Sequence, residues 1–344
     1  MSRKSNTALA AACVLLLTGG EEARSQSVAE FYRGKQIRVI ISAAPATDYD
    51  MFARLISAQM TKLLPGNPTF IHQNMPGAGG IIATNHLYNI APQDGTVIGM
   101  VNRNMPHVAL TKMSNVKFDP AKFNWLGSPE VSHSVCVALT GVPVQRAEDL
   151  FKHDLLIGGA GSGSAPSVTS HLLSNLLGMK LKLVEGYKSV PDVSLAMMRK
   201  EVHGVCQSLN ALQGGNLQGW IAAGKLKVLF NLEPKPLTSL AGIPTIFQYA
   251  KTDEQRAILT LNSSTSVMGR PMLTPPNVPT DRLAALRKAF IEAVNQPELK
   301  AEVERVGGEV TLVTGETMQK VVADIMATPP AIAGKMQQMI QAPK

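Results

Sequence analysis

The sequence predicts an α/β protein of two lobes, each built as a mostly parallel sheet flanked by helices. Its 344 residues are enough for two domains of ordinary size. Short β-branched runs alternate with amphipathic stretches along most of the chain, which is typical of parallel sheets joined by helices. A strand–turn–helix unit near the start also has a counterpart in the second half, and this repetition favours two lobes of similar build.

The first strand–turn–helix unit spans Gln36–Arg54. Residues 37–41 form a short apolar run, as expected of a strand buried on both faces, and Pro45 ends it. The next apolar residues recur with the period of a helix, namely Phe52, Leu55, Ile56, Met60 and Leu63. The turn Pro45–Asp50 therefore lies at a helix N-terminus, where free N–H groups and the helix dipole favour an anion. An ordinary βα connection has the same pattern. This turn alone therefore does not decide between an anion-binding site and a simple connection.

Two further strands of the first half end in segments that are candidates for ligand binding. The strand at 69–73 leads into the loop Asn74–Gly80, which is either a tight turn or a backbone cradle for a ligand oxygen. The strand at 96–101 is followed by Arg103. Open α/β sheets bind ligands at the carboxyl ends of their strands, so Arg103 is either a carboxylate clamp or an ordinary surface arginine.

The counterpart unit of the second half runs from a strand at 154–157 through a glycine- and serine-rich loop to a helix at 167–177. The glycines of this loop let the backbone approach a ligand closely. Three serines either cap the helix or donate hydroxyl groups to a ligand: Ser162, Ser164 and Ser167. A phosphate-binding P-loop is excluded, because no Gly-Lys-Ser/Thr follows.

Two more candidates follow in the second half. Tyr187 lies in the loop Gly186–Pro191, and Gln207 comes directly after a strand at 203–206. The segment 261–273 is expected to run back to the first lobe, and helices are predicted from Thr280 and over 316–325. A Met-rich stretch then closes the chain and is expected to pack against the core.

Composition excludes several classes of protein. Hydrophobic residues make up 45% and charged residues 17%, as in a globular chain with a sizeable core. The net charge of +8 comes from scattered residues and aromatics are only 5%, so no nucleic-acid surface is indicated. The seven histidines show no HExxH or other metal-ligand spacing, and no GxSxG elbow is present. The sequence therefore predicts no enzyme, no metal and no cofactor.

The first 27 residues predict a signal peptide. Arg3 and Lys4 precede an apolar stretch, Ala8–Thr18, and Ser25-x-Ser27 fits a cleavage site. No later run of about 18 apolar residues follows, so we expect an exported soluble protein. After export two cysteines would remain, Cys136 and Cys206, and an oxidising compartment permits a disulfide between them. Two buried free thiols are the alternative.

An ordered set of motifs covers nearly all of the mature chain and resembles the Bug (TctC-type) family of periplasmic solute-binding receptors of tripartite tricarboxylate transporters. The motifs are IRVII…AP…D..AR at 37–54, QNMPGAGG at 73–80, APQDGTVIG at 91–99, VPVQRAEDL at 142–150, GSGSAPS at 161–167, GIPT at 242–245 and PPNVPTDRLAALRKAF at 275–290. No single motif is specific to this family, but the occurrence of all of them in the family's order is.

The resemblance implies a two-lobed periplasmic-binding-protein fold that closes like a clamshell around a small organic acid, with two crossing strands as its hinge. It divides the chain into a signal peptide (1–27), a first lobe (28–131 and 265–344) and a second lobe (132–264). It also implies a monomer in the periplasm that binds no cofactor and no nucleic acid and delivers its ligand to membrane permease subunits. The ligand contacts that the resemblance and the pattern together predict are Thr47, Asp48, Tyr49, Asp50, Gly77, Ala78, Gly79, Arg103, Ser162, Ser164, Ser167, Tyr187 and Gln207.

The chain departs from the family pattern at two of these places. Many relatives carry a glycine triad after the proline, where this chain has Ala46, Thr47 and Asp48, and Gln207 stands where many carry Asp. Asp48 either caps its helix or faces the cleft, where it would repel a ligand carboxylate. The alternatives to a transport receptor are a ligand-presenting component of a sensor and a hydrolytic enzyme.

Overall fold

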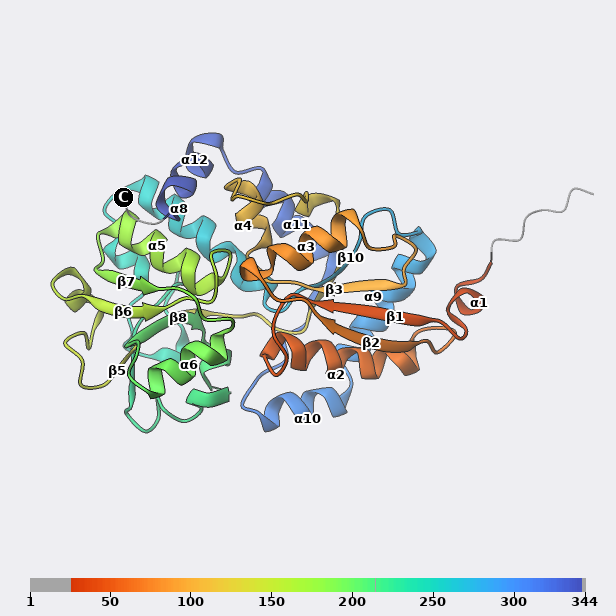
Figure 1. Cartoon of the computed structure of the whole chain (residues 1–344), viewed down its shortest axis with the longest axis horizontal. Helices are drawn as coiled ribbons and strands as arrows, with labels where there is room; N and C mark the ends of the chain where they lie inside the picture. Colours follow the sequence, from red (N-terminus) through yellow and green to blue (C-terminus); the bar gives the residue numbers. More distant parts are fainter. Residues whose placement is uncertain (1–25, 214, 342–344) are drawn as a thin grey trace, which may run out of the picture.

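The protein consists of two α/β lobes, each organised around its own sheet (Figure 1). The computed structural model describes residues 26–213 and 215–341. The signal peptide predicted for residues 1–27 lies almost entirely outside them. In spatial order, the first sheet contains β11 (Val313–Thr314), β4 (Asn124–Ser128), β10 (Met272–Thr274), β3 (Val97–Met100), β1 (Gln36–Ile41) and β2 (Thr69–Asn74). The second contains β7 (Leu181–Val184), β6 (Leu155–Gly158), β8 (Gly204–Ser208), β5 (Ser134–Leu139) and β9 (Leu226–Asn231).

Helices flank both sheets. Those whose packing places them with the first sheet are α1 (Val28–Tyr32), α2 (Asp48–Leu63), α3 (Ile81–Asn89), α4 (Met105–Leu110), α9 (Thr280–Val294), α10 (Pro297–Arg305) and α11 (Gly315–Met326). Those with the second are α5 (Ala165–Leu177), α6 (Val190–Met198), α7 (Leu209–Gln213), α8 (Asp253–Ser263) and α12 (Pro330–Met339). Two short 3-10 helices matter below, η1 (Ala78–Gly80) and η7 (Ser264–Met268).

The two-lobed α/β fold confirms the prediction, and the sheets themselves are mixed. In the first sheet β1 pairs in parallel with β2 and β3, whereas β10 runs antiparallel to both β3 and β4. In the second sheet β6 pairs in parallel with β7 and β8, whereas β5 runs antiparallel to β8 and β9. The reversed strands β5 and β10 are the ones that the chain enters as it crosses from one lobe to the other.

The crossing segments lie side by side between the lobes. Residues 129–133 lead from β4 to β5, and residues 264–271 return from α8 to β10. The backbone N–H of Ser132 in the first segment donates to the carbonyl of Ser266 in the second at 2.8 Å. These two segments form the connection that the predicted hinge requires.

The last helix, α12, packs on the second lobe. It contacts α5 and α8 (Figure 1), and Met336 joins Val168 and Leu172 of α5 in one buried cluster. The sequence prediction placed everything after residue 264 with the first lobe. The Met-rich stretch instead finds its apolar partners on α5 and α8, because these helices present an apolar face that the second sheet does not cover.

Local sequence explains why the first strand–turn–helix unit forms. Ile37, Val39 and Ile41 of β1 are fully buried against α2 and α9. The hydroxyl of Thr47 accepts a hydrogen bond from the backbone N–H of Asp50 and caps α2, so the helix begins at Asp48, before the apolar stripe. Within the described ranges, no helix has the combination of length and apolar content that spanning a membrane requires.

Candidate functional site

A cavity of about 370 Å³ lies between the two lobes. Lining residues come from the ends of β1 and β3 and from η1 in the first lobe, and from the end of β8 and the loops before α5 and α6 in the second. The first turns or caps of α2, α3, α5 and α6 all contribute to its wall. Because helix N-termini carry free N–H groups and partial positive charge, this arrangement favours an anionic or acceptor-rich ligand.

The two glycine-rich loops contact each other at one side of this cavity. A Cβ placed on Gly79 would lie 2.3 Å from the backbone nitrogen of Ser164, and one placed on Gly163 would lie 2.8 Å from the carbonyl oxygen of Ala78. Gly79 also has φ of +65°, a conformation that glycine adopts at little cost. The lobes therefore meet backbone to backbone at this point, and only glycine permits so close an approach.

The turn after β1 contains Ala46 in a conformation that normally favours glycine. Its φ is +62°, and its N–H donates to the carboxylate of Asp50 at 3.1 Å. Asp50 also accepts hydrogen bonds from Arg54 and Asn74. Burial opposes ionisation of this carboxyl, but those hydrogen bonds outweigh it and lower the pKa of Asp50. Asp50 is thus a structural group that holds the turn, and it does not line the cavity.

Asp48 lines the cavity and is held by a buried arginine of the second crossing segment. The Nε of Arg270 donates to its carboxylate at 2.9 Å, and a terminal nitrogen of the same guanidinium makes a second contact. Asp48 Oδ1 accepts from the backbone N–H of Tyr49. Asp48 therefore faces the cavity, but its negative charge is compensated by Arg270. Neither of the two predicted alternatives, a helix cap alone or an unpaired charge in the cleft, describes it fully.

Arg270 connects several parts of the wall. Its side chain is 4% exposed, and it contacts the buried carboxylate of Glu130 at 3.1 Å. The same guanidinium donates to the hydroxyl groups of Ser132 and Ser208, and it lies 4.6 Å from the centre of the Tyr49 ring. Burial alone would lower the pKa of Arg270, but the two carboxylates outweigh this effect and raise it. Arg270 is therefore fully charged and joins the first lobe, the hinge and the end of β8.

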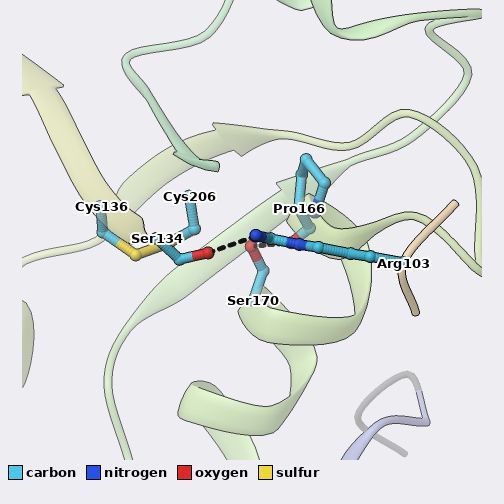
Figure 2. The surroundings of a disulfide bond; sticks show 6 residues. All are labelled: Arg103, Ser134, Cys136, Pro166, Ser170 and Cys206. Atoms are coloured by element: carbon cyan, nitrogen blue, oxygen red, sulfur yellow. Dashed lines mark hydrogen bonds between the residues drawn. A yellow bond between two sulfur atoms is a disulfide. The ribbon is translucent and has the colours of Figure 1, made fainter. Parts of the chain in front are cut away.

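Arg103 extends from the end of β3 into the second lobe. Figure 2 shows its guanidinium reaching Ser134, beside the Cys136–Cys206 bridge and near the start of α5. It donates to the hydroxyl of Ser134 at 2.6 Å and to the carbonyl of Ser132. Among the described residues no carboxylate lies within ion-pair distance of it. Burial lowers the pKa of Arg103, which means that the site holds this charge at a cost.

Two lining residues, Ser42 and Gln207, have buried polar side-chain atoms without a hydrogen-bond partner among the described residues, and only in Gln207 are a donor and an acceptor both unpaired. Gln207 is 3% exposed at the end of β8, and neither its amide nitrogen nor its amide oxygen has a hydrogen-bond partner among the described residues. The preceding residue, Cys206, lies opposite Cys136 on β5, and the structure joins the two in a disulfide (Figure 2). The covalent link thus fixes the backbone directly beside Gln207.

Most of the predicted site residues come together at this cavity. Its lining includes Thr47, Asp48, Tyr49, Gly77, Ala78, Gly79, Arg103, Ser164, Tyr187 and Gln207. Ser164 also caps α5, so capping and lining are compatible roles. Ser167 is buried behind Ser164 and accepts a hydrogen bond from its hydroxyl, whereas Ser162 lines a separate groove with His171 and Glu185. Together with Asp50, these two serines lie outside the cavity wall.

Sequence reasoning missed six polar residues of the wall: Ser42, Asn102, Lys188, Ser189, Ser208 and Arg270. Ser42 directly follows β1 and Asn102 follows β3, so the rule that pointed to Arg103 also applies to them. Arg270 is different, because its partner Asp48 is 222 residues away in the sequence. The only local signal was that Arg270 is the one charged residue of the return segment 264–271. No cluster of three or more His, Cys, Asp or Glu side chains that could hold a metal occurs in the described part of the chain.

Comparisons with known proteins agree with this architecture. Residues 52–337 match the model of the tripartite tricarboxylate transporter family receptor. A UPF0065 protein from Cupriavidus necator is 21% identical over 91% of this chain and 90% of its own length. The periplasmic binding protein BugD has 20% identity and a TM-score of 0.68, over 90% of this chain and 98% of its own. MatC from Rhodopseudomonas palustris, solved with bound malate, has 17% identity and a TM-score of 0.68, over 89% and 99%.

The family match confirms two predictions made from the sequence, the resemblance itself and the assignment to solute receptors instead of enzymes. It covers both lobes and both crossing segments. The similar structures, at 20% identity or less, support the two-lobed fold. The chain belongs to the family of tripartite tricarboxylate transporter receptors.

Proposed function

We propose that this protein captures a small organic acid between its two lobes and delivers it to the membrane permease subunits of a tripartite transporter. The observation that carries the proposal is the cavity itself. Four helix N-termini and the buried Arg103 surround about 370 Å³ of space to which both lobes contribute. Positive partial charges of this kind attract carboxylates, and MatC, a protein of similar fold, holds malate.

The proposal includes a closing motion. Polar groups on both sides of the cavity can hold one ligand only when the lobes are together, and the contact of Gly79 with Ser164 is such a closed arrangement. Without ligand the two lobes would open and close, and ligand binding would stabilise the closed arrangement. The segments at 129–133 and 264–271 would serve as the hinge. The lobes would be divided as predicted, 28–131 and 265–344 against 132–264, except that α12 would move with the second lobe, on which it packs.

The proposal also places the protein in the periplasm as a monomer. The first 27 residues would direct export and would then be removed, since a basic start, an apolar stretch and a cleavage site follow one another there as in a signal peptide. Mass spectrometry of the protein recovered from the periplasmic fraction would locate the mature N-terminus. A form that retains residues 1–27 and stays in the cytoplasm would contradict export.

Thermal shift and titration calorimetry test the binding step. The mature protein would be mixed with a panel of mono-, di- and tricarboxylic acids at pH 7.5. A ligand that binds only the folded state raises the melting temperature, by an amount equivalent to about 2.7 kcal/mol at one hundred times its Kd. At least one acid should do so, and small-angle scattering should then show a smaller radius of gyration. If no acid of the panel binds, the proposal is wrong.

Uptake measurements test the delivery step. Cells that lack this chain should lose uptake of the acid identified in the titration, and the chain supplied in trans should restore it. Unchanged uptake in the deletion strain would contradict delivery, even where binding is established.

A further inference from the structure

The amide of Gln207 is the strongest indication of the ligand's chemistry. Its nitrogen and oxygen are both buried without a partner among the described residues, and Gln207 is one of the residues that line the cavity. A buried amide that makes none of its hydrogen bonds destabilises the protein, because it has given up its bonds to water without replacement. A glutamine amide donates through nitrogen and accepts through oxygen. Only a ligand group that does both satisfies it fully.

Of the two buried arginines in the described wall, one is paired with carboxylates and the other is not, so the wall can neutralise one negative charge of a ligand. Arg270 is compensated by Asp48 and by Glu130, and the second carboxylate also accepts from Asn210. Arg103 is buried, and within the described ranges its guanidinium donates only to the carbonyl of Ser132 and the hydroxyl of Ser134. A ligand carboxylate placed at Arg103 would therefore supply its missing counter-charge, and it would not disturb an existing ion pair.

Gln207 and Arg103 both line the cavity, where the strand pair β5–β8 ends. Arg103 donates to Ser134, whose partner across these antiparallel strands is Ser208. Gln207 is the next residue and lies opposite Val135, so its side chain leaves the sheet on the face opposite to Ser134 and Ser208. Figure 2 shows Arg103 approaching Ser134 beside Cys206, the residue before Gln207. A ligand that reaches across the end of β8 within the cavity can therefore contact both residues.

Apart from Arg103, the described wall offers a second carboxylate no buried cation that lacks a counter-charge. Several of its other residues are small and apolar, namely Ala43, Ala44, Ala160, Ala165, Pro166, Pro191 and Ala211. The remaining lysine of the lining, Lys188, is exposed to solvent. A second carboxylate directed at Gln207 would satisfy the amide nitrogen but face the amide oxygen, and two acceptors at hydrogen-bond distance repel each other.

From these contacts we infer that the ligand is a short monocarboxylate whose other end is a neutral group that donates and accepts, best met by a primary carboxamide. Gln207 pairs with the carboxamide through two reciprocal hydrogen bonds, and Arg103 binds the carboxylate. This inference rests on the proposed function, because it names the class of acid that the interlobe cavity takes. It assigns to Gln207 the discrimination between monoamides and dicarboxylates.

Matched pairs of acids test the inference on the mature protein. Titration calorimetry would compare malonate, succinate, glutarate and adipate with the monoamide of each acid. Within the pair of the preferred length, the monoamide should bind at least about tenfold more tightly, since a dicarboxylate leaves the Gln207 oxygen without a donor. A dicarboxylate that binds as tightly as its monoamide, or more tightly, overturns the inference.

The results also separate this inference from the proposed function. If none of these eight acids binds but another organic acid does, the inference falls and the receptor function stands. If no acid of any class binds, both fall. The inference is supported only by a preference for the monoamide within a pair.

A charge substitution at Gln207 provides a gain-of-function test. In Gln207→Glu the group becomes an acceptor only, so affinity for the monoamide should fall about tenfold, and an ammonium-terminated acid of the same length should gain affinity. The matched control is Gln218→Glu, which makes the same change at an exposed glutamine outside the cavity lining. Equal effects of the two substitutions, or no gain for the ammonium acid in a folded Gln207→Glu protein, overturn the inference.

Discussion

The two lobes fix their walls of the cavity by different means. In the first lobe, the turn after β1 carries Asp48, and an arginine from the hinge region compensates its charge. In the second lobe, the end of β8 is tied to β5 by the Cys136–Cys206 bridge, and Gln207 beside it keeps an unpaired amide. One wall therefore depends on ion pairs that tertiary structure assembles, and the other depends on a covalent link between neighbouring strands. The carboxylate of Asp48 is thus already paired, whereas the amide of Gln207 remains for the ligand.

Removal of Arg270 should have the largest effect on this arrangement. In Arg270→Met the carboxylates of Asp48 and Glu130 lose their shared cation, and Glu130 is 2% exposed. We expect the free energy of unfolding to fall by about 3–5 kcal/mol, as when one partner of a buried ion pair is removed. Urea denaturation at pH 7.5 measures this change.

The control for Arg270→Met is Arg256→Met, because Arg256 pairs with Asp253 on the exposed surface of α8. That substitution should leave the unfolding midpoint nearly unchanged. A loss below about 1 kcal/mol in Arg270→Met would show that the ion pairs do not hold the first-lobe wall.

Reduction of the disulfide tests the other wall. The bridge joins residues 70 apart, so it restricts the unfolded chain considerably. We expect reduction to lower the free energy of unfolding by about 2–4 kcal/mol. A thiol count on the unreduced, unfolded mature protein checks the bridge directly. Two free thiols for each chain would contradict it and would return Cys136 and Cys206 to the alternative of buried thiols.

The contrast between the walls also explains what the sequence could predict. β1 and α2 follow from residues close together in the chain, because an apolar run, a proline and a helical stripe suffice to define them. The polar residues after β1, β3 and β8 could be identified as candidates because the carboxyl ends of strands meet at one edge. These are local signals combined with one general rule of sheet topology.

Features that depend on distant parts of the chain were not predicted. The partner of Asp48 follows the return crossing, so its neutralisation is visible only in three dimensions. The glycines at 79 and 163 indicated a backbone cradle, but nothing local showed that the two loops would contact each other. The position of α12 on the second lobe depends likewise on which apolar face the other helices leave uncovered.

Gly79→Ala should weaken ligand binding without unfolding the protein. The added methyl group would meet the backbone of Ser164, so the two glycine loops could no longer touch. We expect affinity for the preferred acid to fall about tenfold, equivalent to about 1.4 kcal/mol, because closure becomes less favourable. Titration calorimetry measures the affinity, and scattering should show an incomplete decrease of the radius of gyration.

The matched control is Gly178→Ala at the end of α5. Gly178 has φ of +72°, close to that of Gly79, but nothing lies within 4 Å of its added Cβ. It carries the same backbone strain without a contact between lobes. Unchanged affinity in Gly79→Ala, or an equal loss in both variants, would show that the loop contact does not contribute to closure.

The smallest and most specific effect is expected from Asp48→Asn. This substitution keeps the shape of the side chain but releases Arg270 from one of its two carboxylates, so more positive charge faces the cavity. Dicarboxylates should then gain about threefold relative to the preferred acid, or about 0.7 kcal/mol. The control is Asp50→Asn, which removes a charge two residues away; its partners are the N–H of Ala46 and the side chains of Arg54 and Asn74, none of which lines the cavity. Calorimetry of all three proteins against one set of mono-, di- and amino-carboxylates gives the comparison. An unchanged rank order with affinities within about twofold would mean that Glu130 alone compensates Arg270 and that Asp48 only supports the turn.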